Sequence, residues 1–256
     1  MVNLIRMDLY RMLKSKSFLA CLALTFALAL ASTPLARLLF TLANTFSPEL
    51  KEAFPMEVNL SAILRDPFPM AGLMLLLLSL CWFFHADVEN GYIKNIAGQV
   101  PMKGLTVVSK FAAAFVHNAI FVVAGILGNL IGTLVMQRII PDAQILDSIR
   151  VVLLKLLLIQ SISAILLMAV ATFRSKSLGM VLAVVFGLGL TPVIYFGINE
   201  GLKPIFGQEA DITRFMPDMV MKENPLDTLK ALAVAAVSGG IFLLPAVRVF
   251  DRKDVK

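Results

Sequence analysis

Residues 111–137 read FAAAFVHNAIFVVAGILGNLIGTLVMQ, a run of 27 residues without a charged side chain. A helix rises about 1.5 Å per residue, so roughly 20 apolar residues cross the hydrocarbon core of a membrane. This run therefore predicts a transmembrane helix. Five more uncharged runs lie along the chain, at 17–36, 67–86, 156–173, 177–199 and 231–247.

The two shortest runs, 156–173 and 231–247, each follow a lysine. They reach the length of a span if the side chains of Lys155 and Lys230 extend to the membrane interface. The composition agrees, because 59% of the residues are hydrophobic and only 16% are charged, which is unusual for a soluble domain. We therefore predict an all-α, polytopic membrane protein with six transmembrane helices.

The net charge of +6 does not indicate nucleic-acid binding. The Lys and Arg residues are distributed between the loops in the way that sets the orientation of a membrane protein. With both termini in the cytoplasm, the inside segments hold 13 Lys and Arg in 57 residues, and the outside segments hold 10 in 81. This bias follows the positive-inside rule. The inside segments are 1–17, 85–110, 173–177 and 248–256, and the outside segments are 37–66, 137–155 and 199–230.

Residues 2–16 are expected to form an amphipathic helix ahead of the first span. Its apolar stripe holds Val2, Ile5, Leu9, Met12 and Leu13, and its polar face holds Asn3, Asp8, Arg11, Lys14 and Ser15. Such a helix lies in the inner interface, as a simple anchor or also as a contact for a cytosolic partner. The predicted organisation is an interfacial helix at 1–16, a transmembrane domain at 17–250 with external loops at 43–66, 138–150 and 199–227, and a cytoplasmic tail at 251–256.

Small residues recur at every fourth position in several spans, a pattern typical of close helix packing in lipid. We expect most of them to pack within one subunit, although one stripe could face a second subunit. The fifth span carries Gly179, Ala183, Gly187 and Thr191, and the third carries Gly128 and Gly132. Aromatic and Met residues of spans two and five could line a substrate path or simply face lipid, and the candidates are Met74, Phe83, Phe186 and Tyr195.

The sequence contains no recognisable catalytic motif. His85 and His117 stand outside any metal-binding spacing, and the spans hold no Asp or Glu. There is no GxSxG elbow and no P-loop. We therefore predict no catalytic, metal or cofactor residue, and no enzyme activity in this chain. His117 is expected to be a packed or hydrogen-bonded helix residue, and Cys21 and Cys81 are expected to be apolar filler rather than a disulfide.

The absence of a P-loop directs attention to the cytoplasmic loop 85–110. Val88, Tyr92, Ile93 and Ile96 would form an apolar arc on a short helix, with Glu89 near its N-terminus, where a carboxylate complements the helix dipole. Such a helix could lie on lipid or dock into a groove of a cytosolic protein.

The order of these features resembles the permease subunit of type-2 ABC exporters. The resemblance covers the topology of the whole chain, and in residues it concentrates at 1–20 and in the segment Glu89-x-Gly91, with Pro101, Lys103 and Lys110 after it. It implies a coupling helix that docks into a separate ATPase, which would bind ATP and magnesium. By resemblance, the coupling residues are Glu89, Gly91, Tyr92, Ile93, Lys94 and Ile96.

The resemblance further implies a pair of permeases, either two copies of this chain or one copy and a paralogue, with two ATPases in the bacterial cytoplasmic membrane. Small bacterial members of that class export peptides or confer immunity to them. Apolar spans and 12 acidic against 10 basic residues on the outer side favour a membrane-active, amphipathic peptide as cargo. The alternatives are a lipid, polysaccharide or drug exporter, a non-transporting immunity or sensor protein, and an intramembrane enzyme.

Overall fold

The computed structural model describes residues 1–46, 55–69, 71–89, 104–173, 175–206, 211–223 and 227–252. These residues are almost entirely helical, as predicted. The long helices are α2 (Lys16–Phe46), α4 (Gly72–Glu89), α6 (Gly104–Met136), α7 (Ile145–Phe173) and α11 (Thr228–Arg252). The shorter elements are α1 (Val2–Lys14), α3 (Leu60–Arg65), α8 (Lys176–Gly187), α9 (Thr191–Phe206), the 3₁₀ helix Ile212–Phe215 and α10 (Pro217–Lys222).

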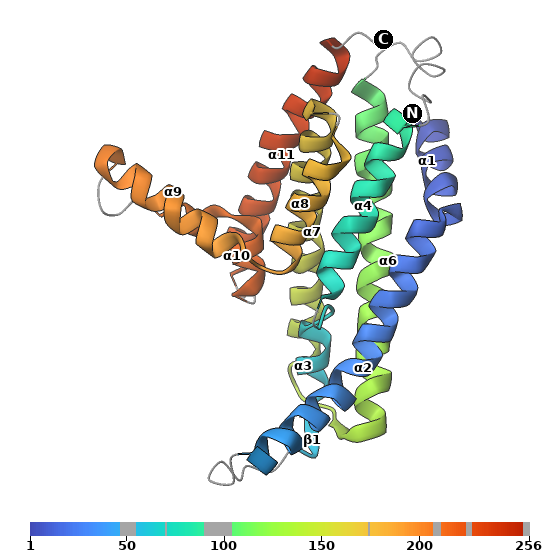
Figure 1. Ribbon diagram of the computed structural model, residues 1–256, viewed down its shortest axis with the longest axis vertical. Coiled ribbons are helices and arrows are strands. Elements are labelled where there is room, and N and C mark those ends of the chain that lie inside the picture. The colour runs from blue at the N-terminus through green and yellow to red at the C-terminus, as the bar shows by residue number, and fades with distance from the viewer. Residues whose placement is uncertain are drawn as a thin grey trace.

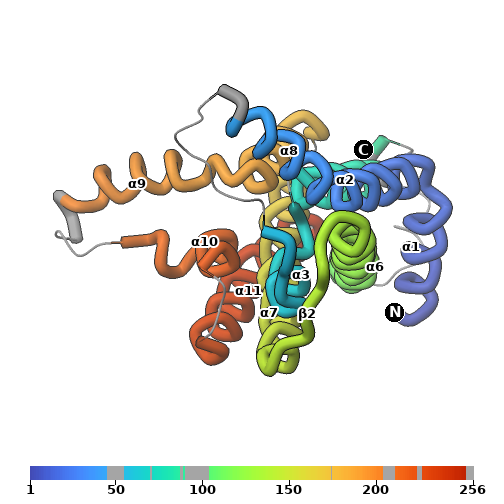
Figure 2. Tube along the Cα trace, turned by 90° about the horizontal axis from the view of Figure 1, so that it is seen from below, coloured from blue at the N-terminus to red at the C-terminus, as the bar shows by residue number. Residues whose placement is uncertain are grey.

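The long helices form an elongated bundle, with the start of α1 and the end of α11 at the same end (Figure 1). Helix α7 lies in the core, where it packs against α11, α6, α10 and α3, and the side chains of Leu158, Ile159, Ile162 and Leu166 are fully buried. Helix α2 packs mainly on α6, and α4 on α8. Seen along the bundle, α9 projects away on one side and α1 lies on the opposite side (Figure 2).

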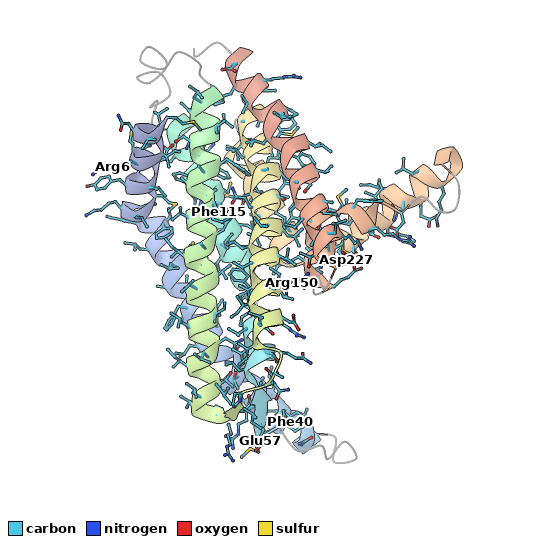
Figure 3. All side chains as sticks on the ribbon, turned by 180° about the vertical axis from the view of Figure 1, so that it is seen from behind. Arg6, Phe40, Glu57, Phe115, Arg150 and Asp227 are labelled. Carbon is cyan, nitrogen blue, oxygen red and sulfur yellow. The ribbon has the colours of Figure 1, made fainter. Side chains whose placement is uncertain are left out.

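The helices have the length and composition of membrane spans. Among the described residues, α2, α6, α7 and α11 are each long and apolar enough to cross a membrane, and the pair α8–α9 would add a fifth span. Helix α4 is apolar but shorter. Large apolar side chains of α6, such as Phe115 and Leu134, are exposed, and Figure 3 shows Phe115 on the outer face of the helix. This chain is therefore a multi-pass membrane protein.

The fifth apolar run does not form the single straight helix that its length predicts. Helices α8 and α9 meet at an angle of 95°. Gly189, between them, has a φ of +68°, a left-handed conformation that glycine adopts without steric cost. Pro192 follows as the second residue of α9, in the first turn of the helix, where its missing N–H costs no hydrogen bond. The run is broken because Gly189 and Pro192 together favour a turn over a continued helix.

Two segments predicted as external loops hold a short parallel sheet. Strand β1 (Glu57–Asn59) pairs with β2 (Arg138–Ile140), so that Val58 lies opposite Ile139. The sequence shows no sign of this pairing, because three-residue strands carry too little alternation to be recognised. The sheet joins the segment just before α3 to the segment just after α6, at the end of the bundle far from α1 (Figure 1).

Two further expectations are wrong in detail. Helix α7 begins at Ile145, so it includes the last residues of the segment 138–150 that was predicted as an external loop. Asp8, assigned to the polar face of the N-terminal helix, is buried and accepts a hydrogen bond of 2.5 Å from the Ser109 hydroxyl of α6. Helix α1 therefore packs on the bundle through a polar contact as well as through Met12, whose side chain is also buried.

Candidate functional site

A cavity of about 730 Å³ opens between α3, α7, α10 and the break between α8 and α9. Its volume falls in the range of small-molecule sites. Three cationic side chains line it, from Arg65, Lys155 and Lys222. Asp66 is the one acidic residue among the described lining residues. The remaining wall is largely apolar and includes Phe186, which is almost fully buried.

The three cations each donate to neutral oxygen atoms. The Arg65 Nε donates to the Ser148 hydroxyl at 3.1 Å, and its Nη2 donates to the Gln144 amide oxygen at 2.9 Å. The Lys155 Nζ donates to the Arg65 carbonyl oxygen at 2.6 Å, and the Lys222 Nζ donates to the Gly189 carbonyl oxygen at 3.2 Å. These bonds tie α3, α7, α10 and the helix break together around the cavity.

A buried carboxylate lies beside the same helix break. Asp218 of α10 is 1% exposed and accepts hydrogen bonds from the hydroxyl groups of Thr191 and Tyr195, the latter at 2.8 Å. The sequence placed this residue in an external loop, but α10 folds back onto α7 and α11. The carboxylate therefore fixes the start of α9 to the bundle.

The middle of α9 is also held by an aspartate. The Asp211 carboxylate accepts hydrogen bonds from the Thr213 hydroxyl, from the Thr213 amide at 3.0 Å and from the Asn199 side chain at 3.0 Å. The Thr213 hydroxyl makes the largest contribution to holding the pKa of Asp211 below its usual value. The segment after α9 is thereby bound to α9 itself.

A second polar group is buried between α4, α6 and α7. The His117 Nε2 and the Ser79 hydroxyl share a hydrogen bond of 3.0 Å, and the Asn118 amide donates to Gln160 at 2.9 Å and to Ser163 at 3.0 Å. The His117 ring also stacks on Phe121, with centroids 4.5 Å apart. The prediction that His117 is a packed, hydrogen-bonded helix residue is confirmed. Hydrogen bonds of this kind link helices where no water competes.

Of the predicted coupling residues, only Glu89 lies within the described residues. It ends α4, its side chain is exposed, and its carboxylate accepts a hydrogen bond from the Lys176 Nζ at 3.4 Å. Gly91, Tyr92, Ile93, Lys94 and Ile96 lie outside the described residues.

The small residues lie where helices meet within this one chain. A Cβ on Gly128 or Gly132 would collide with the backbone of α2 at Phe26 or Leu30, respectively. On α8, Gly179 lies against Cys81 and Gly187 lies against Met74, both of α4. The fully buried Ala183 lies between these two glycines on α8. Thr191 does not belong to this stripe, because it follows the helix break. Cys21 and Cys81 are both free and buried, in agreement with the prediction of apolar filler.

The four candidate path residues do not gather around one cavity. Phe186 lines the basic cavity, whereas Met74 packs beside Gly187. Phe83 is half-buried, with the Lys110 ammonium 4.6 Å from the centre of its ring. The Tyr195 hydroxyl donates a hydrogen bond to the Asp218 carboxylate.

The basic cavity could not be predicted from the sequence, because its three cations come from segments that are far apart in the chain. The one usable signal was Lys155, a cation next to a long apolar run. Among the described residues, no group of three His, Cys, Asp or Glu side chains is placed to hold a metal ion.

No protein-family model matches the chain, and no curated protein matches it.

Proposed function

We propose that this chain is the permease subunit of an ATP-driven exporter in the bacterial cytoplasmic membrane. In this proposal it crosses the membrane six times, with α2, α4, α6, α7, the broken pair α8–α9 and α11, and both termini are cytoplasmic. Five of the six uncharged runs lie mainly on one helix each, and the run 177–199 is divided between α8 and α9. The chain has no P-loop, so a separate ATPase would supply the energy.

The proposal rests on two contacts at one end of the bundle. They link the end of α4 to α8 and the start of α6 to α11. At the start of α6, the Gly104 amide donates to the Asp251 carboxylate of α11 at 2.5 Å. At the end of α4, Glu89 pairs with Lys176 at the start of α8. A force applied to the chain between Glu89 and Gly104 would therefore reach four helices at once.

This arrangement suits a mechanism in which an ATPase moves the permease between two states. Closure of an ATPase dimer would shift the positions of α4 and α6, and the ion pair and hydrogen bond would pass the shift on to α8 and α11. ATP binding changes the population of the two states only if the ATPase binds one of them more tightly. The coupling residues Glu89, Gly91, Tyr92, Ile93, Lys94 and Ile96 would form the docking contact.

The proposed cargo is an amphipathic or hydrophobic molecule, with a membrane-active peptide as the first candidate and a lipid, polysaccharide or drug as the alternatives. The outer faces of the helices are apolar, so such a cargo could enter sideways from the membrane. A non-transporting immunity or sensor protein would share the fold but would not stimulate an ATPase.

Co-purification with the ATPase tests the proposal. Ile93→Asp would place an uncompensated charge in an apolar contact, and we expect it to abolish ATPase binding and stimulated ATP hydrolysis. The matched control is Leu146→Asp, because Leu146 is 79% exposed at the other end of the bundle. Full coupling in Ile93→Asp, at normal expression, would show that the segment lies on lipid instead.

The cargo has a separate test. Cells with and without the permease and its ATPase would be compared for the amount of membrane-active peptide that they retain. Lower retention in cells with the pair supports peptide export. Equal retention, combined with altered lipid or polysaccharide export, supports the alternative.

A further inference from the structure

The side chains that line the basic cavity carry a net positive charge. Arg65, Lys155 and Lys222 carry three positive charges, and Asp66 supplies one negative charge. The described hydrogen bonds of these three cations all go to neutral oxygens. Elsewhere in the described chain, lysines such as Lys203 and Lys230 pair with a glutamate.

Lys155 is partly buried among the side chains that line the cavity. It lies ten residues after Ile145, about 15 Å along the most buried of the long apolar helices. Lys155 directly precedes the uncharged run 156–173, and a partly buried ammonium favours a partner group of opposite charge. The Arg65 carbonyl oxygen engages only one donor of the Lys155 ammonium, which has three.

The donors converge from three different elements. Arg65 comes from the end of α3, Lys155 from the middle of α7 and Lys222 from the end of α10. A guanidinium has five N–H donors, and the described bonds of Arg65 use two of its nitrogens. Donors that approach from three sides suit a group with several acceptor oxygens around one centre, as in a phosphate.

The rest of the wall determines what such a group could be attached to. Phe68, Leu73, Ile159 and Phe186 line the same cavity. At its rim, Asp66 and Lys222 are exposed. A ligand could therefore place a charged head among the cations and an apolar portion against the aromatic and aliphatic side chains.

We propose that this cavity binds the phosphate group of a phosphorylated amphiphile, such as the headgroup of an anionic membrane lipid. The net charge of the lining, three cations against one carboxylate, complements a phosphate group of one or two negative charges. A cationic peptide would be repelled from this cavity. The proposal holds whether or not the chain is an exporter, because it rests on the cavity alone.

Binding to the purified full-length chain tests the proposal. Three probes are measured by calorimetry in uncharged detergent: dioctanoyl phosphatidic acid, dioctanoylglycerol and inorganic phosphate. The first carries both the phosphate and the acyl chains, the second only the chains and the third only the anion. We expect phosphatidic acid to bind and its affinity to fall as salt is added. We expect dioctanoylglycerol to bind at least tenfold more weakly.

Variants locate the binding in the cavity. Lys155→Met keeps the length of the side chain and removes its charge, and we expect about a tenfold loss of affinity for phosphatidic acid, the loss that one charge-assisted hydrogen bond would cause. Lys222→Gln changes an exposed rim residue, so it keeps the proposal testable if Lys155→Met does not fold. The control is Lys14→Met, an exposed lysine at the other end of the molecule.

The outcomes are distinct. A selective loss in the two cavity variants supports the proposal, and competition by inorganic phosphate would then identify free phosphate as a second source of the bound group. Equal binding of phosphatidic acid and dioctanoylglycerol would overturn it. Unchanged affinity in Lys155→Met or in Lys222→Gln, with Lys14→Met as reference, would overturn it as well.

Discussion

Gly187 of α8 lies directly against Met74 of α4: a Cβ at position 187 would stand 2.3 Å from the Met74 Cα. The two backbones can approach this closely only because position 187 has no side chain. The contact lies just before the helix break, so it helps to position both the turn at Gly189 and the wall of the basic cavity.

Gly187→Ala should therefore push α4 and α8 apart. Overpacking of this kind costs about 1–3 kcal/mol of the free energy of unfolding, and thermal unfolding in detergent would measure it. The matched control is Gly197→Ala on α9, where an added Cβ would meet nothing within 4 Å. Because alanine favours a helix over glycine, the control should keep or raise the stability. Equal melting temperatures for the two variants would contradict the close contact.

Asp218→Ala should loosen the attachment of α9. The change removes the acceptor of two buried hydroxyl groups, from Thr191 and Tyr195. Leaving buried donors unsatisfied costs about 1–3 kcal/mol each. We expect a lower melting temperature and faster proteolysis of α9, whereas Asp147→Ala, at an exposed position, should change stability by less than about 0.5 kcal/mol. The reverse order of the two effects would show that Asp218 does not anchor α9.

The proposed topology predicts which positions can be labelled on intact cells. In a variant without Cys21 and Cys81, Glu57→Cys should react with a membrane-impermeant thiol reagent, because residue 57 would face outward. Tyr10→Cys should react only after the cells are permeabilised. Both residues are exposed at opposite ends of the molecule (Figure 3 shows Glu57). Labelling of Tyr10→Cys on intact cells would reverse the orientation.

The proposed assembly predicts two permease chains and two ATPases in the active complex. A two-fold dimer is the commonest closed arrangement of subunits, and six helices are few to enclose a path. Mass measurement of the complex in detergent should give two copies of this chain, or one copy and a paralogue. A single permease chain in a complex that still hydrolyses ATP would reject the prediction.

Much of the fold could be predicted from the sequence, because the membrane imposes a simple constraint. A backbone in lipid must satisfy its own hydrogen bonds, so every long apolar run becomes a helix. The runs around Phe121, Leu158 and Val234 each lie on a long helix. The small stripe through Gly128 and Gly132 likewise predicted a close helix contact, and these glycines lie against α2.

The sequence by itself determined the helical class and the membrane character of this protein, since both depend on local hydrophobicity and on the spacing of charges. Only the tertiary structure decided the 95° break in the fifth run, the burial of Asp8 and Asp218 and the basic cavity. The cavity brings together Arg65, Lys155 and Lys222 from three separate helices. Hydropathy records how polar each residue is, but the partner that a polar side chain finds depends on how distant helices pack.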